Sequence, residues 1–214
     1  MRLTVISDTH GHHEKLGVLN GDVLIHCGDM FNMFDSGADD LERLDDWFGR
    51  QRFGLILCTG GNHDFALQEF GADRAPFENA VYLRDRSYVH EGVAFYGAPW
   101  IPDLTGQAFF KGSEELARSW SAIPDGTDVL ITHTPPAGRL DLSSRGFRLG
   151  CQHLLARLRE VSPRVHCFGH VHASSGVVEA DGTSFINAAV VDSRYRLARG
   201  PYEHVLSIAS GRRA

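Results

Sequence analysis

Residues 2–13 read RLTVISDTHGHH, a run of apolar side chains that ends abruptly in polar, metal-binding residue types. The first half is typical of a buried β-strand, because apolar residues fall on both of its faces. Two similar runs follow at 22–27 (DVLIHC) and 53–58 (FGLILC). Strands of this kind occur in parallel or mixed sheets covered by helices, so this part of the chain predicts an α/β fold.

Strand-like and helix-like runs alternate along the rest of the chain. Further strands are predicted at 86–97, 128–132, 164–168, 176–187 and 203–208, with turns at Glu91-Gly92 and Asp181-Gly182 that indicate hairpins. Helices are predicted at 39–51, 64–70, 113–120 and 150–160. The order indicates an α/β sandwich with outer helices. No repeat, low-complexity tract or linker divides the chain, so we expect one domain over residues 1–214.

The amino-acid composition argues against some classes of binding partner. The 214 residues carry 21 Lys and Arg against 27 Asp and Glu, a net charge of −6, which argues against binding of duplex nucleic acid on a basic face. The four cysteines form no CxxC pair and are expected to be reduced thiols. We expect no signal peptide, no membrane span and a cytoplasmic location, because Met1 leads directly into the first strand and no long apolar stretch follows.

Five short segments each follow a strand-like run and carry metal-ligand chemistry. They are Asp8-Thr9-His10, Gly28-Asp29, Gly61-Asn62-His63-Asp64, His133 and Gly169-His170-Val171-His172. Ligands bind beyond the carboxyl ends of strands in α/β sheets, so the five segments are expected to converge. Carboxylate, amide and imidazole donors without thiolate suit manganese, iron or zinc. A single carboxylate, Asp29, could bridge two ions about 3.5–4 Å apart, which is the spacing that phosphoryl transfer uses.

The same segments, in this order, resemble the calcineurin-like binuclear metallophosphoesterase superfamily. Five further segments are similar to its small metallophosphoesterase-domain-containing subgroup: Tyr96 to Trp100, Asp128 to Pro136, Gly150-Cys151, Arg164 to Gly169 and Phe185 to Ala188. The resemblance implies a four-layer α/β/β/α sandwich with two mixed sheets and outer helices. It also implies two divalent metal ions as cofactors, manganese first, with iron or zinc as alternatives.

The resemblance also implies a role for each residue of the five segments. One metal would be held by Asp8, His10, Asp29 and His172. The other would be held by Asp29, Asn62, His133 and His170. His63 would be the general acid, Asp64 would orient it, and a metal-bound hydroxide would attack phosphorus. Since some animal members lack the histidine equivalent to His170, its presence indicates a competent centre.

Two departures from the protein phosphatases of the superfamily bear on the substrate. Those enzymes carry an arginine shortly after the bridging aspartate and usually read GNHE, whereas this chain reads GDMFNM at 28–33 and GNHD at 61–64. The missing arginine would have held a phosphomonoester dianion. We therefore expect a phosphodiesterase of EC 3.1.4 type that acts on small phosphodiesters, with cyclic nucleotides, including 2′,3′-cyclic forms, as candidates. The alternatives are a phosphomonoesterase or protein phosphatase on the same centre, and a non-catalytic scaffold.

Four residues are candidates for contacts with the substrate. His12 and His13 follow the first metal loop and could meet a phosphate, although a surface loop is the simpler interpretation. Trp100 and Phe110 lie in the long loop 98–112 and could stack a nucleobase or pack in the core. The expected partner is a small phosphodiester or nucleotide, with no membrane and no duplex nucleic acid, and a homo-oligomeric state is left open.

Overall fold

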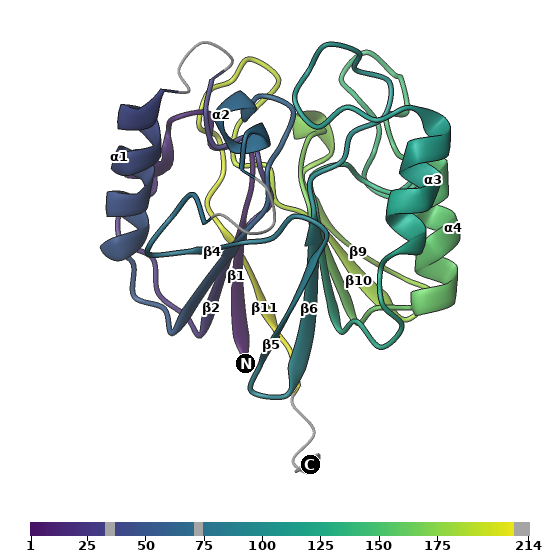
Figure 1. Cartoon of the computed structure of the whole chain (residues 1–214), viewed down its shortest axis with the longest axis horizontal. Helices are drawn as coiled ribbons and strands as arrows, with labels where there is room; N and C mark the ends of the chain where they lie inside the picture. Colours follow the sequence, from purple (N-terminus) through teal and green to yellow (C-terminus); the bar gives the residue numbers. More distant parts are fainter. Residues whose placement is uncertain (33–36, 71–74, 208–214) are drawn as a thin grey trace.

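Two mixed β-sheets pack face to face between outer helices (Figure 1). The computed structural model describes residues 1–32, 37–70 and 75–207. Helix α1 (Ala38–Gly49) covers one side, and α3 (Ser113–Ser121) and α4 (Gln152–Val161) cover the other. Three short helical segments lie among the loops: η1 (His13–Leu16), α2 (Phe65–Gln68) and η2 (His172–Ser174). This confirms the predicted α/β sandwich with two mixed sheets and outer helices.

The first sheet has the strand order β11-β1-β2-β3-β4. Its strands are β1 (Arg2–Ile6), β2 (Val23–His26), β3 (Leu55–Cys58), β4 (Val81–Tyr82) and β11 (Tyr202–Val205). Strands β1 to β4 are parallel, and β11 pairs antiparallel with β1. The two-residue strand β4 was not predicted, because it is too short to show a periodic pattern. The predicted strand at 203–208 begins one residue earlier and ends at Val205, and Ile208 lies outside the described residues.

The second sheet has the order β5-β6-β7-β8-β10-β9. Its strands are β5 (Arg86–His90), β6 (Val93–Ala98), β7 (Val129–Thr132), β8 (Val165–Phe168), β9 (Gly176–Ala180) and β10 (Thr183–Asn187). The two predicted hairpins are confirmed: β5 pairs with β6, and β9 with β10, in antiparallel register. Both turns have positive φ at both central residues, which is the geometry that two-residue hairpin turns require.

Successive side chains along a strand point to opposite faces of the sheet, and here apolar clusters lie on both faces. Leu3 and Val5 of β1 pack with Val129 and Ile131 of β7 in one cluster drawn from both sheets. Leu24, from the neighbouring strand β2, belongs instead to the cluster that contains the aromatic side chains of α1. The central strands of both sheets are therefore buried on both faces, and the metal-ligand residue types gather at the strand ends. Within the described ranges, no helix combines the length and the apolar character needed to cross a membrane.

Candidate metal centre

The predicted metal-binding residues come together where strands of both sheets end. Asp8 follows β1, Asp29 follows β2, and Asn62 follows β3. His133 directly follows β7, and His170 and His172 follow β8. All of these side chains, and that of His10, join one network of contacts between nitrogen and oxygen atoms.

Asp29 lies at the centre of the network. Its Oδ2 lies 3.4 Å from Nε2 of His133, 3.7 Å from Nε2 of His10 and 3.9 Å from Nε2 of His63. Its Oδ1 accepts the backbone N–H of His63 at 2.8 Å. Asp29 is only 2% exposed, so a buried carboxylate faces three imidazoles with little solvent between them.

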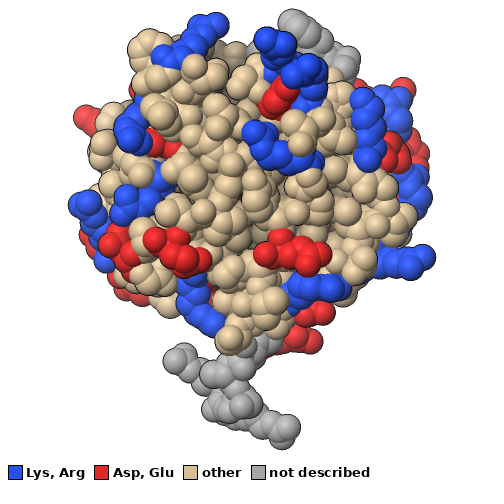
Figure 2. Space-filling view, turned by 180° about the vertical axis from the view of Figure 1, so that it is seen from behind, with Lys and Arg blue, Asp and Glu red and all other residues tan. Residues whose placement is uncertain are grey.

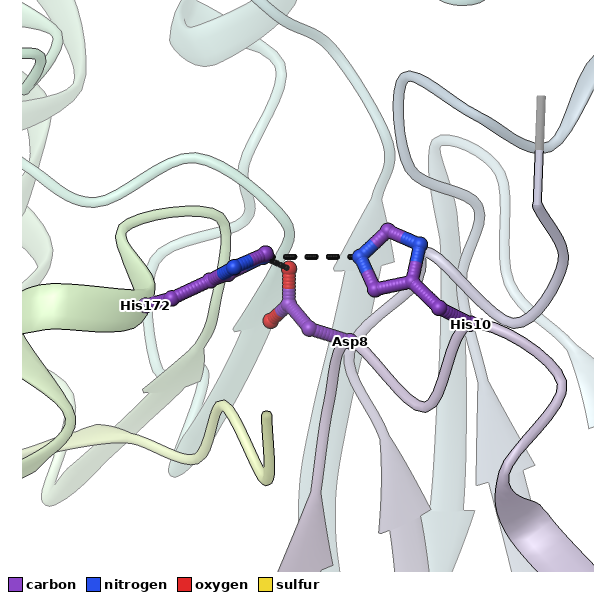
Figure 3. A group of neighbouring side chains, drawn as sticks. All are labelled: Asp8, His10 and His172. Carbon is purple, nitrogen blue, oxygen red and sulfur yellow. Dashed lines mark hydrogen bonds and ion pairs between the residues drawn. The ribbon is translucent and has the colours of Figure 1, made fainter. Parts of the chain in front are cut away.

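One group of donors consists of Asp8, His10 and His172, whose side chains point toward one another (Figure 3). Nε2 of His172 lies 3.2 Å from Oδ1 of Asp8 and 3.4 Å from Nε2 of His10. The backbone N–H of His170 donates to both carboxylate oxygens of Asp8, at 3.1 and 3.0 Å. This group thus joins distant parts of the chain, since Asp8 and His172 are 164 residues apart in sequence.

A second group lies around the side-chain oxygen of Asn62. This oxygen is 3.1 Å from Nε2 of His133 and 2.9 Å from Nδ1 of His170. His133 also contacts Asp29, so Asp29 and Asn62 share one imidazole. The two groups together contain the seven predicted ligands, with Asp29 between them.

The geometry of both groups fits metal ions. Two atoms that each lie about 2.1 Å from one ion, and about 90–110° apart, are separated by roughly 3.0–3.4 Å. The contacts of 2.9 to 3.4 Å among these donors fall close to that range. Sets of three acidic or imidazole donors within 4.8 Å of one another include Asp8 with His10 and His172, and Asp8 with Asp29 and His133.

Hydrogen bonds on the far side of two imidazoles orient them as ligands. Nδ1 of His133 donates to the carbonyl of Cys27 at 2.8 Å, and Nδ1 of His172 donates to the carbonyl of Asp192 at 3.2 Å. Since a carbonyl only accepts, these Nδ1 atoms carry hydrogen and each neutral ring directs the lone pair of Nε2 toward an aspartate. A lone pair facing a carboxylate requires a cation between them, either a proton or a metal ion.

The pKa values of these residues describe the case in which a proton, and not a metal ion, lies between imidazole and carboxylate. Burial opposes charge on every group, yet the Asp29 carboxylate raises the pKa of His133 to about 9. The charge of His133 in turn lowers the pKa of Asp29, and the hydrogen bond from His172 lowers the pKa of Asp8. Metal binding at these residues must therefore displace protons, as it does wherever imidazole and carboxylate ligands are held in place.

The backbone is strained at four of the candidate ligands. Asp8, His10, Asp29 and His170 all have positive φ, between 41° and 67°, a conformation that is uncommon for residues other than glycine. Such strain is concentrated at functional sites, where the surrounding structure maintains it. A Cβ on Gly61 would lie 2.3 Å from Oδ1 of Asp29, so only glycine allows the loop after β3 to approach this carboxylate.

The structure corrects the role predicted for Asp64. Its carboxylate makes no hydrogen bond to the imidazole of His63; it accepts the backbone N–H groups of Met30, Phe31 and Gly61 at 2.8, 3.1 and 2.8 Å. Burial and the nearby charge of Asp29 raise the pKa of Asp64, while these donors oppose the rise. Asp64 therefore fixes the loop after β2 to the loop after β3, and adjacency in sequence did not place it beside the ring of its neighbour.

His26 links the loop after β1, which carries Asp8, to the loop after β2, which carries Asp29. Its Nδ1 accepts the N–H of Gly28 at 3.2 Å, which leaves the hydrogen on Nε2 to be donated to the hydroxyl of Thr9 at 3.0 Å. His26 is fully buried, and burial lowers its pKa to about 3. A neutral histidine thus holds the Asp8 loop against the Asp29 loop, as expected for a hydrogen-bonded core histidine.

A cavity of about 360 Å³ opens above the network. Asp29, Asn62, His63, His170 and His172 line its floor, and its walls are formed by Leu104, Gln107, Ser143, Ser144, Leu149, Val171, Ala173, Ser193 and Tyr195. Among these described residues there is no lysine or arginine. The side chain of His63 is 12% exposed, whereas those of His10 and His133 are fully buried. His63 is therefore positioned to meet a bound molecule.

The four predicted substrate contacts do not line this cavity. Trp100 is 6% exposed and its indole N–H donates to Asp85 at 2.7 Å, so it packs in the core. Phe110 lines a different cavity beside α3 and α4. His13 is buried against Trp47. His12 lies behind the cavity wall, with Nε2 3.0 Å from the carbonyl of Tyr195.

Sequence reasoning missed the residues that form the walls. The long loop 134–149 was an available signal, and it supplies Ser143, Ser144 and Leu149. Tyr195 had no such signal, because it lies in a short polar stretch near the C-terminal end of the chain. The position after Asn32, where the protein phosphatases place their arginine, lies at Met33 in this chain and outside the described residues.

Comparison with known proteins agrees with this geometry. The family model of the calcineurin-like phosphoesterases matches residues 1–174. The chain belongs to this family. The human metallophosphoesterase domain-containing protein 1 is 32% identical over 94% of this chain and 69% of its own length. As a phosphoesterase family member with these candidate ligands, the chain is a metal-binding hydrolase by family, and the identity of the metal is a separate question.

Two solved structures share the fold. Phosphopantetheinyl hydrolase from Mycobacterium tuberculosis has a TM-score of 0.57 and 15% identity, with 90% of each chain covered. A dimetal phosphatase from Danio rerio has a TM-score of 0.51 and 13% identity, with 87% of this chain and 86% of that chain covered. At these identities the likeness establishes the sandwich architecture alone.

Proposed function

We propose that this member of the family is a two-metal phosphodiesterase that hydrolyses small phosphodiesters, with cyclic nucleotides among its candidate substrates. The observation that carries the proposal is a donor network centred on Asp29 beneath a cavity whose described walls contain no lysine or arginine. We further propose Asp8, His10, Asp29, Asn62, His133, His170 and His172 as the metal ligands.

The absence of a cationic side chain from the described cavity walls favours a diester over a monoester. Two divalent ions would contribute +4, and Asp8 and Asp29 −2, so the bound ions by themselves would attract either ester. A phosphodiester carries one negative charge, whereas a phosphomonoester carries two near neutral pH. A site for a dianion is commonly completed by a further cationic side chain. The described walls offer serine, glutamine and apolar side chains instead.

Metal binding and proton donation in the proposed hydrolysis are assigned to different residues of the chain. Two divalent ions held by the candidate ligands would supply Lewis-acid chemistry, activating water and stabilising charge on the phosphoryl oxygens. His63 lies at the cavity floor, where its Nε2 can donate a proton to the departing oxygen. The absence of thiolate among the donors favours manganese, iron or zinc, and manganese is the first metal to test.

The surface charge supports a small substrate rather than duplex nucleic acid. The net charge is −6. On the face shown in Figure 2, Lys and Arg side chains form separate groups around a largely uncharged middle, with acidic groups below. Duplex binding draws on many phosphate contacts along a continuous basic surface, which this face does not offer.

A panel of four substrates tests the preference. The protein, loaded in turn with Mn²⁺, Zn²⁺ and Fe²⁺, is assayed on bis-p-nitrophenyl phosphate, p-nitrophenyl phosphate, and 2′,3′- and 3′,5′-cyclic AMP. We expect kcat/KM for the aryl diester to exceed that for the aryl monoester by about tenfold or more, which corresponds to about 1.4 kcal/mol, since the described walls offer no cation for the second charge of the monoester. Chelation of the metal should abolish both activities.

Two outcomes contradict the proposal. Faster hydrolysis of p-nitrophenyl phosphate than of the diester would assign the centre to monoesters. No turnover of any substrate with any metal would favour a non-catalytic scaffold built on the same fold.

A further inference from the structure

An exposed hairpin forms one wall of the cavity. Leu142 and Arg148 pair as an antiparallel bridge. On one side of this pair the backbone N–H of Ser143 donates to the carbonyl of Phe147, and on the other side the backbone N–H of Leu149 donates to the carbonyl of Asp141. Side chains two residues apart on paired strands share a face. Ser143, Phe147 and Leu149 therefore lie on one face, and two of them, Ser143 and Leu149, line the cavity.

This face presents two large apolar side chains to solvent. Leu149 is 41% exposed and Phe147 is 66% exposed. Of the large exposed hydrophobic residues within the described part of the chain, Leu149 and Tyr195 line this cavity, Phe147 lies beside Leu149 on the hairpin face, and others such as Val89 on the edge strand β5 lie outside the cavity. Apolar side chains gathered at the mouth of a cavity mark a binding surface, whereas single exposed ones are ordinary.

The hairpin is held in place by the structure beneath it. The hydroxyl of Ser174 donates to the carbonyl of Leu142 at 2.7 Å, and the side-chain amide of Asn187 donates to the carbonyl of Leu140 at 3.1 Å. Arg148 pairs with the buried carboxylate of Asp141 at 2.5 Å. A wall fixed in this way can bind a ligand without the cost of ordering a loose loop.

Tyr195 provides a second apolar wall over the metal centre. Its ring lies edge-on to two imidazoles, with centroid distances of 4.8 Å to His10 and 5.2 Å to His172, and tilted against that of His63 at 6.0 Å. Tyr195 is 47% exposed and has a φ of 58°. Its backbone N–H donates to Asp192 at 2.9 Å, so a tight turn holds this ring beside the ligands.

We infer that Phe147, Leu149 and Tyr195 bind an apolar ester group of the substrate, while its single negative charge lies at the metal centre. This inference rests on the proposed diesterase function and names its substrate class: a phosphodiester with at least one apolar or aromatic arm. The neutral walls suit such an arm, because they offer area to bury and no charge to pair with a second phosphate.

Binding of three phosphodiester anions of equal charge tests the inference without requiring turnover. Dissociation constants of dimethyl, dibutyl and diphenyl phosphate are measured by calorimetry on the metal-loaded protein, with the ligand checked for integrity afterwards. We expect diphenyl or dibutyl phosphate to bind about tenfold more tightly than dimethyl phosphate, a fraction of what full burial of such a group yields. Whichever of diphenyl and dibutyl phosphate binds more tightly shows whether the site prefers an aromatic ring or an alkyl chain.

The variants Leu149→Ser and Tyr195→Ser should each reduce that ratio to about threefold or less. Val89→Ser, at an exposed valine outside the cavity, is the matched control and should keep the ratio of the unmodified protein. Equal affinity for all three anions, or an unchanged ratio in both cavity variants, would overturn the inference.

A parallel assay separates this inference from the proposed function. Methyl p-nitrophenyl phosphate and phenyl p-nitrophenyl phosphate release the same p-nitrophenolate and differ only in the retained arm. Hydrolysis of both at equal kcat/KM, with no preference in binding, would refute the apolar site and leave the diesterase function standing. A clear binding preference without hydrolysis of either diester would refute the function and leave the apolar site standing.

Discussion

Replacement of Asp29 by alanine is expected to remove stable binding of both metal ions and to lower diesterase activity by about 1,000-fold or more. The reason is the position of Asp29 between the two donor groups: its Oδ2 lies within 3.4 to 3.9 Å of three imidazoles. No other carboxylate among the described residues comes within 4.0 Å of a ring nitrogen of both His10 and His133. Metal content per chain is measured after desalting, beside activity on bis-p-nitrophenyl phosphate.

Two further variants make that result interpretable. Asp29→Asn retains an oxygen that can accept the backbone N–H of His63, so it separates loss of charge from loss of this hydrogen bond. Asp181→Ala removes an exposed aspartate that pairs with Arg139, and it should keep both metal and activity. A folded Asp29→Ala protein that retains two metal ions and normal turnover would refute the shared role of Asp29.

The variant His63→Ala is expected to keep its metal and to lose rate in proportion to the need for a proton on the departing oxygen. For 2′,3′-cyclic AMP, whose leaving group is an alkoxide, kcat should fall by about 10²- to 10⁴-fold. For bis-p-nitrophenyl phosphate the loss should be about tenfold or less, because p-nitrophenolate departs without protonation. The comparison of the two losses is informative, since either one alone could arise from disturbed packing.

His153→Ala is a matched control for this experiment. His153 lies outside the metal network and contacts the hydroxyl of Ser113 at 2.8 Å, so its removal should affect both substrates equally and slightly. Equal large losses for the alkoxide and p-nitrophenolate substrates in His63→Ala would show that His63 is not the general acid. Loss of metal from this variant would instead place His63 among the ligands.

The convergence of the candidate metal ligands could be predicted because it depends on local order. Each of Asp8, Asp29 and His133 follows a strand whose apolar pattern is visible in the sequence. Parallel strands bring their carboxyl ends to one edge, so the position along the chain already determines the position in space. The same reasoning identified the helices and both hairpins, whose turn residues need positive φ.

The environment of individual side chains could not be predicted in this way. Asp64 is adjacent to His63 in sequence, but its carboxylate is directed toward the backbone of the Asp29 loop. Trp100 lies in a long loop, yet its indole N–H is bound by Asp85 and its ring is covered by Lys111. Such outcomes depend on which segment packs above the loop, and that is decided by tertiary structure.

The residues that line the cavity walls could not be predicted from the sequence, for a related reason. Leu149 lines the cavity because of the register of its hairpin, which one residue of slippage would reverse. Tyr195 reaches the metal centre because the chain returns past β1, where Ser7 pairs with Ala189. Contacts between segments more than 180 residues apart leave no pattern in a single sequence.

Stepwise addition of metal to the metal-free protein tests most directly the claim that two ions, sharing Asp29, carry the hydrolysis. Turnover of bis-p-nitrophenyl phosphate is followed while Mn²⁺, and in parallel Zn²⁺ or Fe²⁺, is added in known ratio to the chain. The structure predicts that activity rises until two equivalents are bound and then stays constant. A plateau at one equivalent, or turnover that does not depend on metal, would contradict the two-metal centre.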